Sequence, residues 1–324
     1  MLKLELHTNT ATRLDSLILE SLRGYASTFS RRILKQWFTQ GRIKNAESDR
    51  PLDPSHKIAP PGCWVRIEGV TEADLHDLTQ AQGAKECFLP ILFEDENLLI
   101  LNKSSGTPSL PLSGSETGTA VSAALARAPQ LASLSSLAPH LGPCPPLEPG
   151  LLHRLDTGTS GVLAFAKTAQ EFVRLREAWK SSEKIYRAIV CPKSPHPLPE
   201  AINTPLAHSR HSSKRMIAFE AEKMRASEIR GKPLPAITLI RDTRICKSAP
   251  EIRLLDLTIE IKTGVFHQIR CHLSANGAPI LGDPIYGKTS STRLWLHAWK
   301  LTLPSANGKA PLLIEAPLPE DWPN

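Results

Sequence analysis

Aromatic residues are scarce in this 324-residue chain, which has three tyrosines and is 5% aromatic overall. No stretch reaches the roughly 18 apolar residues of a membrane-spanning helix, so we expect no membrane span. The first residues, Met1–His7, lack an apolar signal core. The absence of a membrane span and of an apolar signal core predicts a cytoplasmic protein.

Cysteine pairs and cofactor-binding motifs are also missing. The six cysteines are scattered and none forms a C-x-x-C pair, which argues against zinc and for a reducing compartment. They are Cys63, Cys87, Cys144, Cys191, Cys246 and Cys271. No G-x-G-x-x-G stretch opens a helix, and no G-x-x-x-x-G-K-S/T loop is present. We therefore expect neither a metal nor a small-molecule cofactor.

The overall composition is that of a globular protein, with 41% hydrophobic and 22% charged residues. The length leaves room for two domains. The 39 Lys and Arg residues against 32 acids give a net charge of +7. This excess permits an anionic partner without requiring one.

Residues 1–70 are expected to form a small α/β domain. Apolar residues recur at helical spacing over Leu14–Leu22 and over Ile33–Phe38. Ser30 is a suitable N-cap for the second helix, and Gly41 is a suitable stop.

One stretch of this first domain is basic and free of acids. Between residues 21 and 46 the cations are Arg23, Arg31, Arg32, Lys35, Arg42 and Lys44. Such a run is either a solvated helix face or a phosphate-binding surface, and Trp37 within it favours phosphate contact. We predict that Arg31, Arg32 and Lys35 contact phosphates.

The polar, irregular residues 71–88 are expected to link this domain to a larger one over residues 89–324. Strands are predicted at Leu98–Leu101, Val162–Ala166 and Leu255–Ile261, the last half-buried because its apolar and polar residues alternate. Long strands separated by few helices indicate an α+β fold with a mainly antiparallel sheet.

Residues typical of helix termini predict the helices of the larger domain. Thr168–Glu171 is a capping box before one helix, and Gly277 can stop another over His267–Leu273. A short helix is predicted at Val121–Arg127. Proline forbids helix over Pro139–Pro149, which we expect to be extended or mobile.

The most informative stretch is His-Arg-Leu-Asp-Thr-Gly-Thr-Ser-Gly at residues 153–161. Asp156 follows two basic residues and precedes turn-forming ones, at the mouth of a predicted buried strand. Such a carboxylate is placed like a catalytic group, although a turn Asp bonded to its own backbone is the alternative.

This stretch resembles the signature loop of the RluA family of RNA pseudouridine synthases. Further stretches are similar to that family's motifs and follow in the same order: 91–103, 184–188, 263–270 with 282–287, and 296–298. The resemblance implies a mixed, mainly antiparallel sheet. Residues 12–68 resemble a small RNA-binding domain of the ribosomal-protein type.

The resemblance implies isomerisation of specific uridines to pseudouridine in structured ribosomal or transfer RNA, without a cofactor. Asp156 is then the catalytic carboxylate, with Arg270 as its ion-pair partner. Tyr186 is expected to stack on the target base. Arg154 is expected to fill the space that a flipped-out uridine leaves or to hold the displaced RNA backbone.

Several histidines fall inside these motifs. We interpret His153, His267 and His297 as hydrogen-bonding residues of their motifs rather than metal ligands. His153 and Leu296 are also placed among the expected substrate contacts. The protein is expected to be a monomer.

The chain departs from the family pattern at three places, one of which is the proline-rich stretch before His153. Val265-Phe266 stand where the family usually has Arg-Thr, which puts the usual RNA contacts in doubt, and Ser104-Ser105 stand where it usually has Pro-Ala. Asp283 is a rival carboxylate that we assign to a Gly-Asp-Pro turn.

Two other functions remain open from the sequence. The first is a non-catalytic RNA-binding or ribosome-associated protein that retains the fold. The second is a glycosidase, which would need another acid opposite Asp156, and no acid has a supporting motif for that role.

Overall fold

The computed structural model describes residues 2–25, 31–58, 62–71, 81, 83, 87–112, 116–134, 147–194, 196–220, 226–246, 253–305 and 310–323. The chain divides into two compact units. One contains Met1–Cys87 with Leu110–Gly150, and the other contains Phe88–Ser109 with Leu151–Asn324. The predicted boundaries at residues 70 and 88 stay a prediction.

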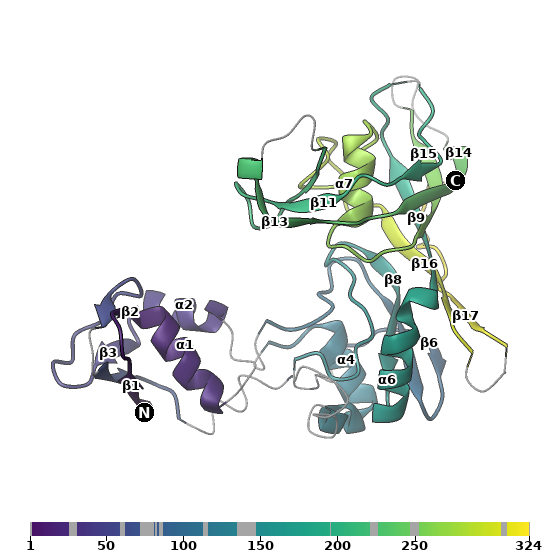
Figure 1. The fold of residues 1–324 in the computed structure, drawn as a ribbon. Coiled ribbons are helices and arrows are strands. Elements are labelled where there is room, and N and C mark those ends of the chain that lie inside the picture. The colour runs from purple at the N-terminus through teal and green to yellow at the C-terminus, as the bar shows by residue number, and fades with distance from the viewer. Residues whose placement is uncertain are drawn as a thin grey trace. The chain divides into compact units, whose positions relative to one another are not determined.

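The first 70 residues contain a three-stranded antiparallel sheet in the order β1-β5-β3, a short β2–β4 pair and two helices (Figure 1). Alternate leucines of β1 are buried, because side chains of a strand point to opposite faces. They share one hydrophobic core with both helices. The elements are β1 (Leu2–His7), β2 (Thr12–Arg13), α1 (Leu14–Tyr25), α2 (Arg31–Thr39), β3 (Ile43–Asn45), β4 (Lys57–Ile58) and β5 (Gly62–Ile67).

Helix α2 ends where the sequence predicts. Gly41 has a φ of 66°, a left-handed conformation that glycine adopts without steric cost. Its N–H donates to the Phe38 carbonyl, and the N–H of Arg42 donates to the Trp37 carbonyl, each over 3.0 Å. This pair of bonds satisfies carbonyls that the helix end leaves open. The predicted N-cap, Ser30, lies outside the described residues.

The first unit also contains α4 (Ala120–Arg127) and the 3₁₀ helix η1 (Pro129–Ser133). The Thr119 hydroxyl caps α4 by accepting the N–H of Ser122 over 3.1 Å. The short helix predicted from the sequence is therefore confirmed. Most of the predicted extended segment Pro139–Pro149 lies outside the described residues.

The second unit is built on a nine-stranded sheet in the order β10-β14-β15-β9-β16-β8-β7-β6, with β17 paired to β16 (Figure 1). Within the described residues, β8 and β16 pair in parallel and the other neighbours are antiparallel. The predicted mixed, mainly antiparallel sheet is confirmed. The strands are β6 (Ile91–Glu94), β7 (Leu98–Lys103), β8 (Ser160–Ala166), β9 (Glu183–Val190), β10 (Ala201–Ile202), β14 (Thr238–Ile245), β15 (Leu255–Ile261), β16 (Leu296–Leu303) and β17 (Leu312–Glu315).

Short helices and a small second sheet complete this unit. The Thr168 hydroxyl accepts the N–H of Glu171 over 3.3 Å, so the predicted capping residue begins α6. No helix among the described residues is both long and apolar enough to cross a membrane. The elements are α6 (Ala169–Ala178), η2 (Trp179–Ser181), β11 (Leu206–Ser209), β12 (Met216–Ala218), η3 (Ala226–Glu228), β13 (Ile229–Leu234) and α7 (Gln268–Ala275).

Strand β15 is more buried than its alternating sequence predicts. Its acidic residues Asp256 and Glu260 are buried together with its apolar face. Arg187 holds Asp256 through two N–H groups, and the indole N–H of Trp322 donates to the same carboxylate over 3.1 Å. Buried charges are tolerated when they are paired in this way. The expectation of a half-buried strand was therefore wrong.

Candidate active site

Asp156 lies in a turn that leads into β8. Its carbonyl accepts the N–H of Thr159 over 3.0 Å, and its side chain is 20% exposed. Leu155 is buried while Arg154 is exposed. The turn therefore anchors itself through Leu155 and leaves the Asp156 carboxylate accessible.

A buried lysine fixes this turn from the neighbouring strand. The Lys103 ammonium, at the end of β7, donates to the carbonyls of Ser104, Thr107 and Thr157 over 3.0, 2.6 and 3.1 Å. Three donors meet three acceptors, which suits an ammonium group. Burial lowers the pKa of Lys103 to about 7, although the charge of Asp156 opposes this shift.

Two serines of the same segment add further contacts. The Ser109 hydroxyl donates to the Leu155 carbonyl over 2.6 Å and accepts the Leu155 N–H over 3.0 Å. The Ser105 hydroxyl donates to the Gly158 carbonyl over 2.8 Å. An alanine at position 105, as the family pattern has it, could not make that bond. Sequence reasoning missed these roles of Ser105 and Ser109.

A glycine allows the strand after Asp156 to approach β16. Gly161 has a φ of 110°, and a Cβ atom there would collide with the carbonyl of Ala298. The parallel pairing of β8 with β16 therefore requires glycine at this position.

Arg270, on helix α7, bridges two carboxylates. Its Nη1 donates to Oδ2 of Asp156 over 2.8 Å, so the predicted contact is present. Its Nε and Nη2 donate to the two oxygens of Asp283 over 2.8 and 2.9 Å. Burial alone would lower the pKa of Arg270, but the two carboxylates outweigh it and raise that pKa. The guanidinium thus makes its bidentate contact with Asp283 and a single contact with Asp156.

Asp283 holds both its own turn and Arg270. Its Oδ1 accepts the N–H groups of Ile285 and Tyr286 over 2.8 and 3.0 Å, which is the expected turn role. Its side chain has no exposed surface. Burial would raise the pKa of Asp283, but Arg270 and the turn N–H groups lower it overall. A buried carboxylate with both oxygens engaged is placed to position Arg270, not to reach a substrate.

His267 faces Asp156 from the start of α7. It has a left-handed φ of 54°, and its Nε2 lies 3.7 Å from Oδ2 of Asp156. The Tyr286 hydroxyl accepts the N–H of Met216 over 2.7 Å and lies 3.2 Å from Nδ1 of His267. The hydroxyl proton is thus free to bond Nδ1, which leaves the ring proton on Nε2 towards Asp156. Burial lowers the pKa of His267 to about 4, against the opposing charge of Asp156, so the ring is neutral.

Tyr186 occupies the middle of the sheet, on β9 between β15 and β16. It pairs with Ile259 on one side and Ala298 on the other, and it is buried. Burial, with a further contribution from the charge of Asp156, raises the pKa of its phenol. The phenol therefore stays neutral at physiological pH and can stack or donate a hydrogen bond.

His153 and Leu296 are packed within the protein. His153 accepts the N–H of Ala164 over 3.2 Å and stacks on Trp179 with ring centroids 5.0 Å apart. Burial lowers the pKa of His153 to about 3. Leu296 is buried in β16. Their role as substrate contacts stays a prediction.

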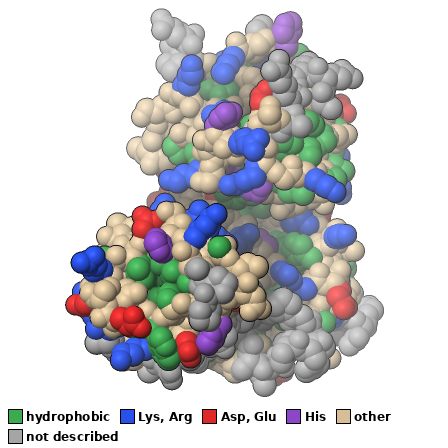
Figure 2. Space-filling model, turned by 60° about the vertical axis from the view of Figure 1, so that its left-hand side comes forward, with side chains coloured by type: hydrophobic (Ala, Val, Ile, Leu, Met, Phe, Trp, Pro, Cys, Tyr) green, Lys and Arg blue, Asp and Glu red, His purple; other side chains and the backbone are tan. Residues whose placement is uncertain are grey.

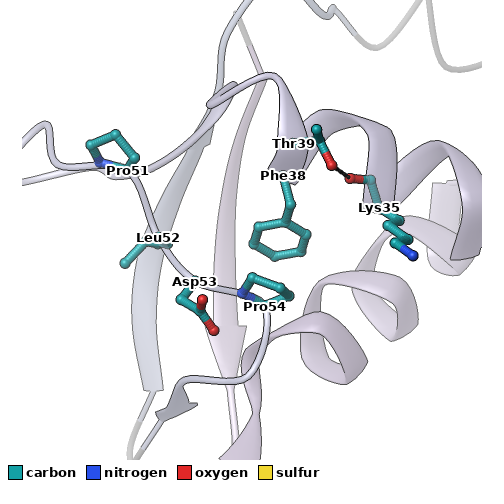
Figure 3. A pocket seen from close by; sticks show the side chains of 7 residues that line it. All are labelled: Lys35, Phe38, Thr39, Pro51, Leu52, Asp53 and Pro54. Atoms are coloured by element: carbon teal, nitrogen blue, oxygen red, sulfur yellow. Dashed lines mark hydrogen bonds between the residues drawn. The ribbon is translucent and has the colours of Figure 1, made fainter.

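The predicted phosphate-binding residues lie on or near α2. Arg31 and Lys35 are exposed four positions apart, on one face of the helix, whereas the side chain of Arg32 lies outside the described residues. Lys35 borders a shallow hollow of about 400 Å³ beside Phe38 and Pro54, and its carbonyl accepts the Thr39 hydroxyl over 3.0 Å (Figure 3).

Histidine is the side chain that most often binds a metal ion. Among the described residues, no group of three or more His, Cys, Asp or Glu side chains is placed to hold a metal ion. His297 contacts the Ser160 hydroxyl over 2.8 Å and the Ala316 carbonyl over 3.4 Å. Its contacts are those of a hydrogen-bonding histidine.

The buried histidines predict acid-sensitive stability. Burial lowers the pKa of His267 and His297 to about 4 and also lowers that of His272. As the pH falls from about 6.5 to about 4, the unfolded chain gains protons that the native protein does not. The free energy of unfolding should then fall by about 1.4 kcal/mol per pH unit for His267 and by the same amount for His297.

Urea unfolding at a series of pH values checks this expectation. The midpoint should move to lower urea across that window, and His297→Gln should reduce the slope by one histidine's share. A stability independent of pH over this range would contradict neutral buried histidines.

The chain resembles known proteins in sequence and in fold. The family model described as RNA pseudouridylate synthase matches residues 97–275, more than half of the chain. The ribosomal large subunit pseudouridine synthase D of Nitrosomonas europaea is 33% identical over 79% of this chain and 68% of its own length. The protein of that name from Zymomonas mobilis is 32% identical over 83% of this chain and 76% of its own.

A solved structure shares the fold. The human RNA pseudouridylate synthase domain containing 1 protein aligns with a TM-score of 0.51 at 20% identity, over 73% of this chain and 86% of its own. At this identity the likeness concerns the fold alone, and it agrees with the predicted α+β class. The family model and the sequence relatives go further: the chain belongs to the RluA family of RNA pseudouridine synthases and is an isomerase that acts on uridine within RNA.

Proposed function

We propose that the protein forms pseudouridine in large-subunit ribosomal RNA, with Asp156 as the catalytic carboxylate. The names of the relatives support the choice of ribosomal over transfer RNA. The observation that carries the catalytic assignment is the placement of Arg270. Asp283 fixes its guanidinium, and one remaining N–H is directed at Asp156.

The reaction exchanges one bond to the sugar for another. The bond from C1′ to N1 of the base breaks, the base turns, and C5 bonds to C1′. C5 then loses its proton and N1 gains one, so no electrons are transferred. The carboxylate attacks C1′, stabilises an oxocarbenium-like state or removes a sugar proton. In each route an oxygen of Asp156 must reach the sugar, and Oδ1 has no hydrogen-bond partner among the described residues.

The other predicted residues suit the handling of a flipped base. Extruding a uridine from structured RNA costs a few kcal/mol, which contacts in the site must offset. Tyr186 offers a neutral aromatic ring near Asp156 for the target base. Arg154 is exposed two residues before Asp156, in position to contact the RNA that the base leaves.

Release of tritium from RNA labelled at C5 of uridine tests this function. Transcripts of large-subunit rRNA, small-subunit rRNA and transfer RNA are offered to the purified protein in parallel. The proposal predicts release from the large-subunit transcript at a defined stoichiometry. Release from transfer RNA alone would overturn the choice of substrate, and release from none would overturn the function.

We infer that residues 1–70 bind RNA as a separate domain. They have their own hydrophobic core and present Arg31 and Lys35 on one helix face. Not every cation of the basic run is available, because Lys44 pairs with Glu68 over 2.9 Å. On the face shown in Figure 2, Lys and Arg side chains are mixed with acidic and apolar ones. The inference therefore depends on two particular cations rather than on overall charge.

Replacing Arg31 and Lys35 together by Ala should weaken RNA binding and make it less dependent on salt. If each contacts one phosphate, the slope of log affinity against log salt should shrink by about 1.4–1.8 units. Filter binding over a salt series measures the slope. Lys57→Ala, which removes another exposed cation of the same domain, is the control. An unchanged slope in the double variant would show that this helix face is exposed to solvent and does not contact RNA phosphates.

A further inference from the structure

Phe266 is an exposed aromatic ring beside the active site. It stands where the family pattern usually has Thr, and it is 45% exposed. Its ring lies 3.7 Å from the ring of His267, with 22° between their planes. A single exposed apolar side chain is common on a protein surface, so the meaning of this ring depends on what surrounds it.

The ring rests on a fixed support. His267, beneath it, is held by the Tyr286 hydroxyl and faces Asp156. On β11 the ring of His208 lies nearly parallel to Phe266, at 25° and with centroids 6.3 Å apart. Nδ1 of His208 is buried without a hydrogen-bond partner among the described residues. Phe266 therefore rests on His267, which faces Asp156, and keeps 45% of its side chain exposed.

Exposed cations follow β11, the strand that carries His208. Arg215 lies over the ring of Tyr286 at 5.3 Å, and both Arg215 and Lys214 are exposed. They belong to the connection between β11 and β12. Proteins that bind single-stranded nucleic acid combine exposed aromatic rings, on which bases stack, with cations that neutralise the phosphates.

We propose that Phe266 is a stacking surface for the base of a nucleotide next to the target uridine, and so helps to select the RNA. The target itself must place its sugar at Asp156, and the ring of His267 separates Phe266 from that carboxylate. This inference rests on the proposed function. It goes beyond it by assigning a recognition residue that the family pattern lacks.

The contribution of such a ring has a known scale. Removing an aromatic ring that stacks on a base weakens binding by about 5- to 150-fold. The effect should be larger for a purine, whose two rings give more overlap. Because the contact does not touch the reacting sugar, its loss should raise KM and leave the rate at saturating RNA unchanged.

Three substitutions separate stacking from packing. Phe266→Ala and Phe266→Leu should both raise KM for the RNA by about 5- to 150-fold. Phe266→Tyr keeps a flat ring and should leave KM close to that of the parent. Leu retains apolar cover over His267 but has no flat face. If Leu behaves like the parent, Phe266 only packs and the proposal is wrong. Phe88→Ala removes another exposed ring, which precedes the first strand of the large sheet, and is the matched control.

RNA with a missing base supplies the second test. An RNA hairpin that contains the target uridine is made with an abasic site in place of the nucleotide on the 5′ or the 3′ side of that uridine. Affinities for the protein are measured by fluorescence anisotropy. At one of the two positions, the abasic site should lower the affinity of the parent protein for the hairpin as much as Phe266→Ala does. The same abasic site should not lower the affinity of the Phe266→Ala variant any further. Independent losses at both positions would overturn the proposal while leaving the function intact. Absence of turnover in the parent would instead remove the proposed function.

Discussion

Asp156→Asn is expected to reduce pseudouridine formation by a factor on the order of 10³–10⁶, the range seen when a catalytic group is deleted. The substitution keeps the size of the side chain and an oxygen for Arg270. It removes the charge that the anomeric carbon needs in each possible route. Because RNA contacts elsewhere are untouched, affinity should be close to that of the parent.

Tritium release and filter binding on the same RNA measure the two quantities separately. Asp242→Asn is the matched control, because this acid is half exposed and pairs with Arg244 on β14. Turnover of Asp156→Asn within tenfold of the parent would move the catalytic role to another residue. Loss of binding with the same substitution would assign Asp156 to substrate affinity instead.

Arg270→Lys is expected to lower the rate at saturating RNA by about 100-fold, the scale of a misplacement of about 1 Å in an active site. Lysine keeps the charge but presents it as a single point. It cannot span Asp283 with two parallel bonds and also donate to Asp156. The buried Asp283 would lose part of its pairing, so unfolding free energy should fall by about 1–3 kcal/mol.

Asp283→Asn separates positioning from direct contact. It leaves Arg270 in place and removes the charge that fixes its orientation. The rate at saturating RNA should fall while KM changes little, because Asp283 is buried away from the substrate. If the rate is unchanged in both variants, the bridge from Asp283 through Arg270 does not position the carboxylate.

Local sequence signals predicted much of the fold. The cap at Thr168 and the stop at Gly41 each depend on bonds within a few residues, and both were found where predicted. The order of the strands depends on pairings far apart in the chain. β16 lies between β9 and β8, and only the structure shows that Gly161 must pass the Ala298 carbonyl.

The site was predictable in its charged groups and not in their connections. The motifs identified Asp156 and Arg270, which are 114 positions apart and in contact. Sequence alone does not say which carboxylate takes the two parallel N–H groups of a guanidinium, so Asp283 was assigned to a turn alone. Lys103 is the last residue of the matching stretch 91–103, but its bond to the Thr157 carbonyl depends on tertiary packing.

Mapping pseudouridine in the large-subunit rRNA of cells with and without this gene tests the central claim most directly. Cells that lack the gene are supplied with the parent protein or with Asp156→Asn at equal abundance. We predict that at least one pseudouridine disappears, that the parent protein restores it, and that Asp156→Asn does not. A large-subunit map that is identical in all the strains would contradict the claim.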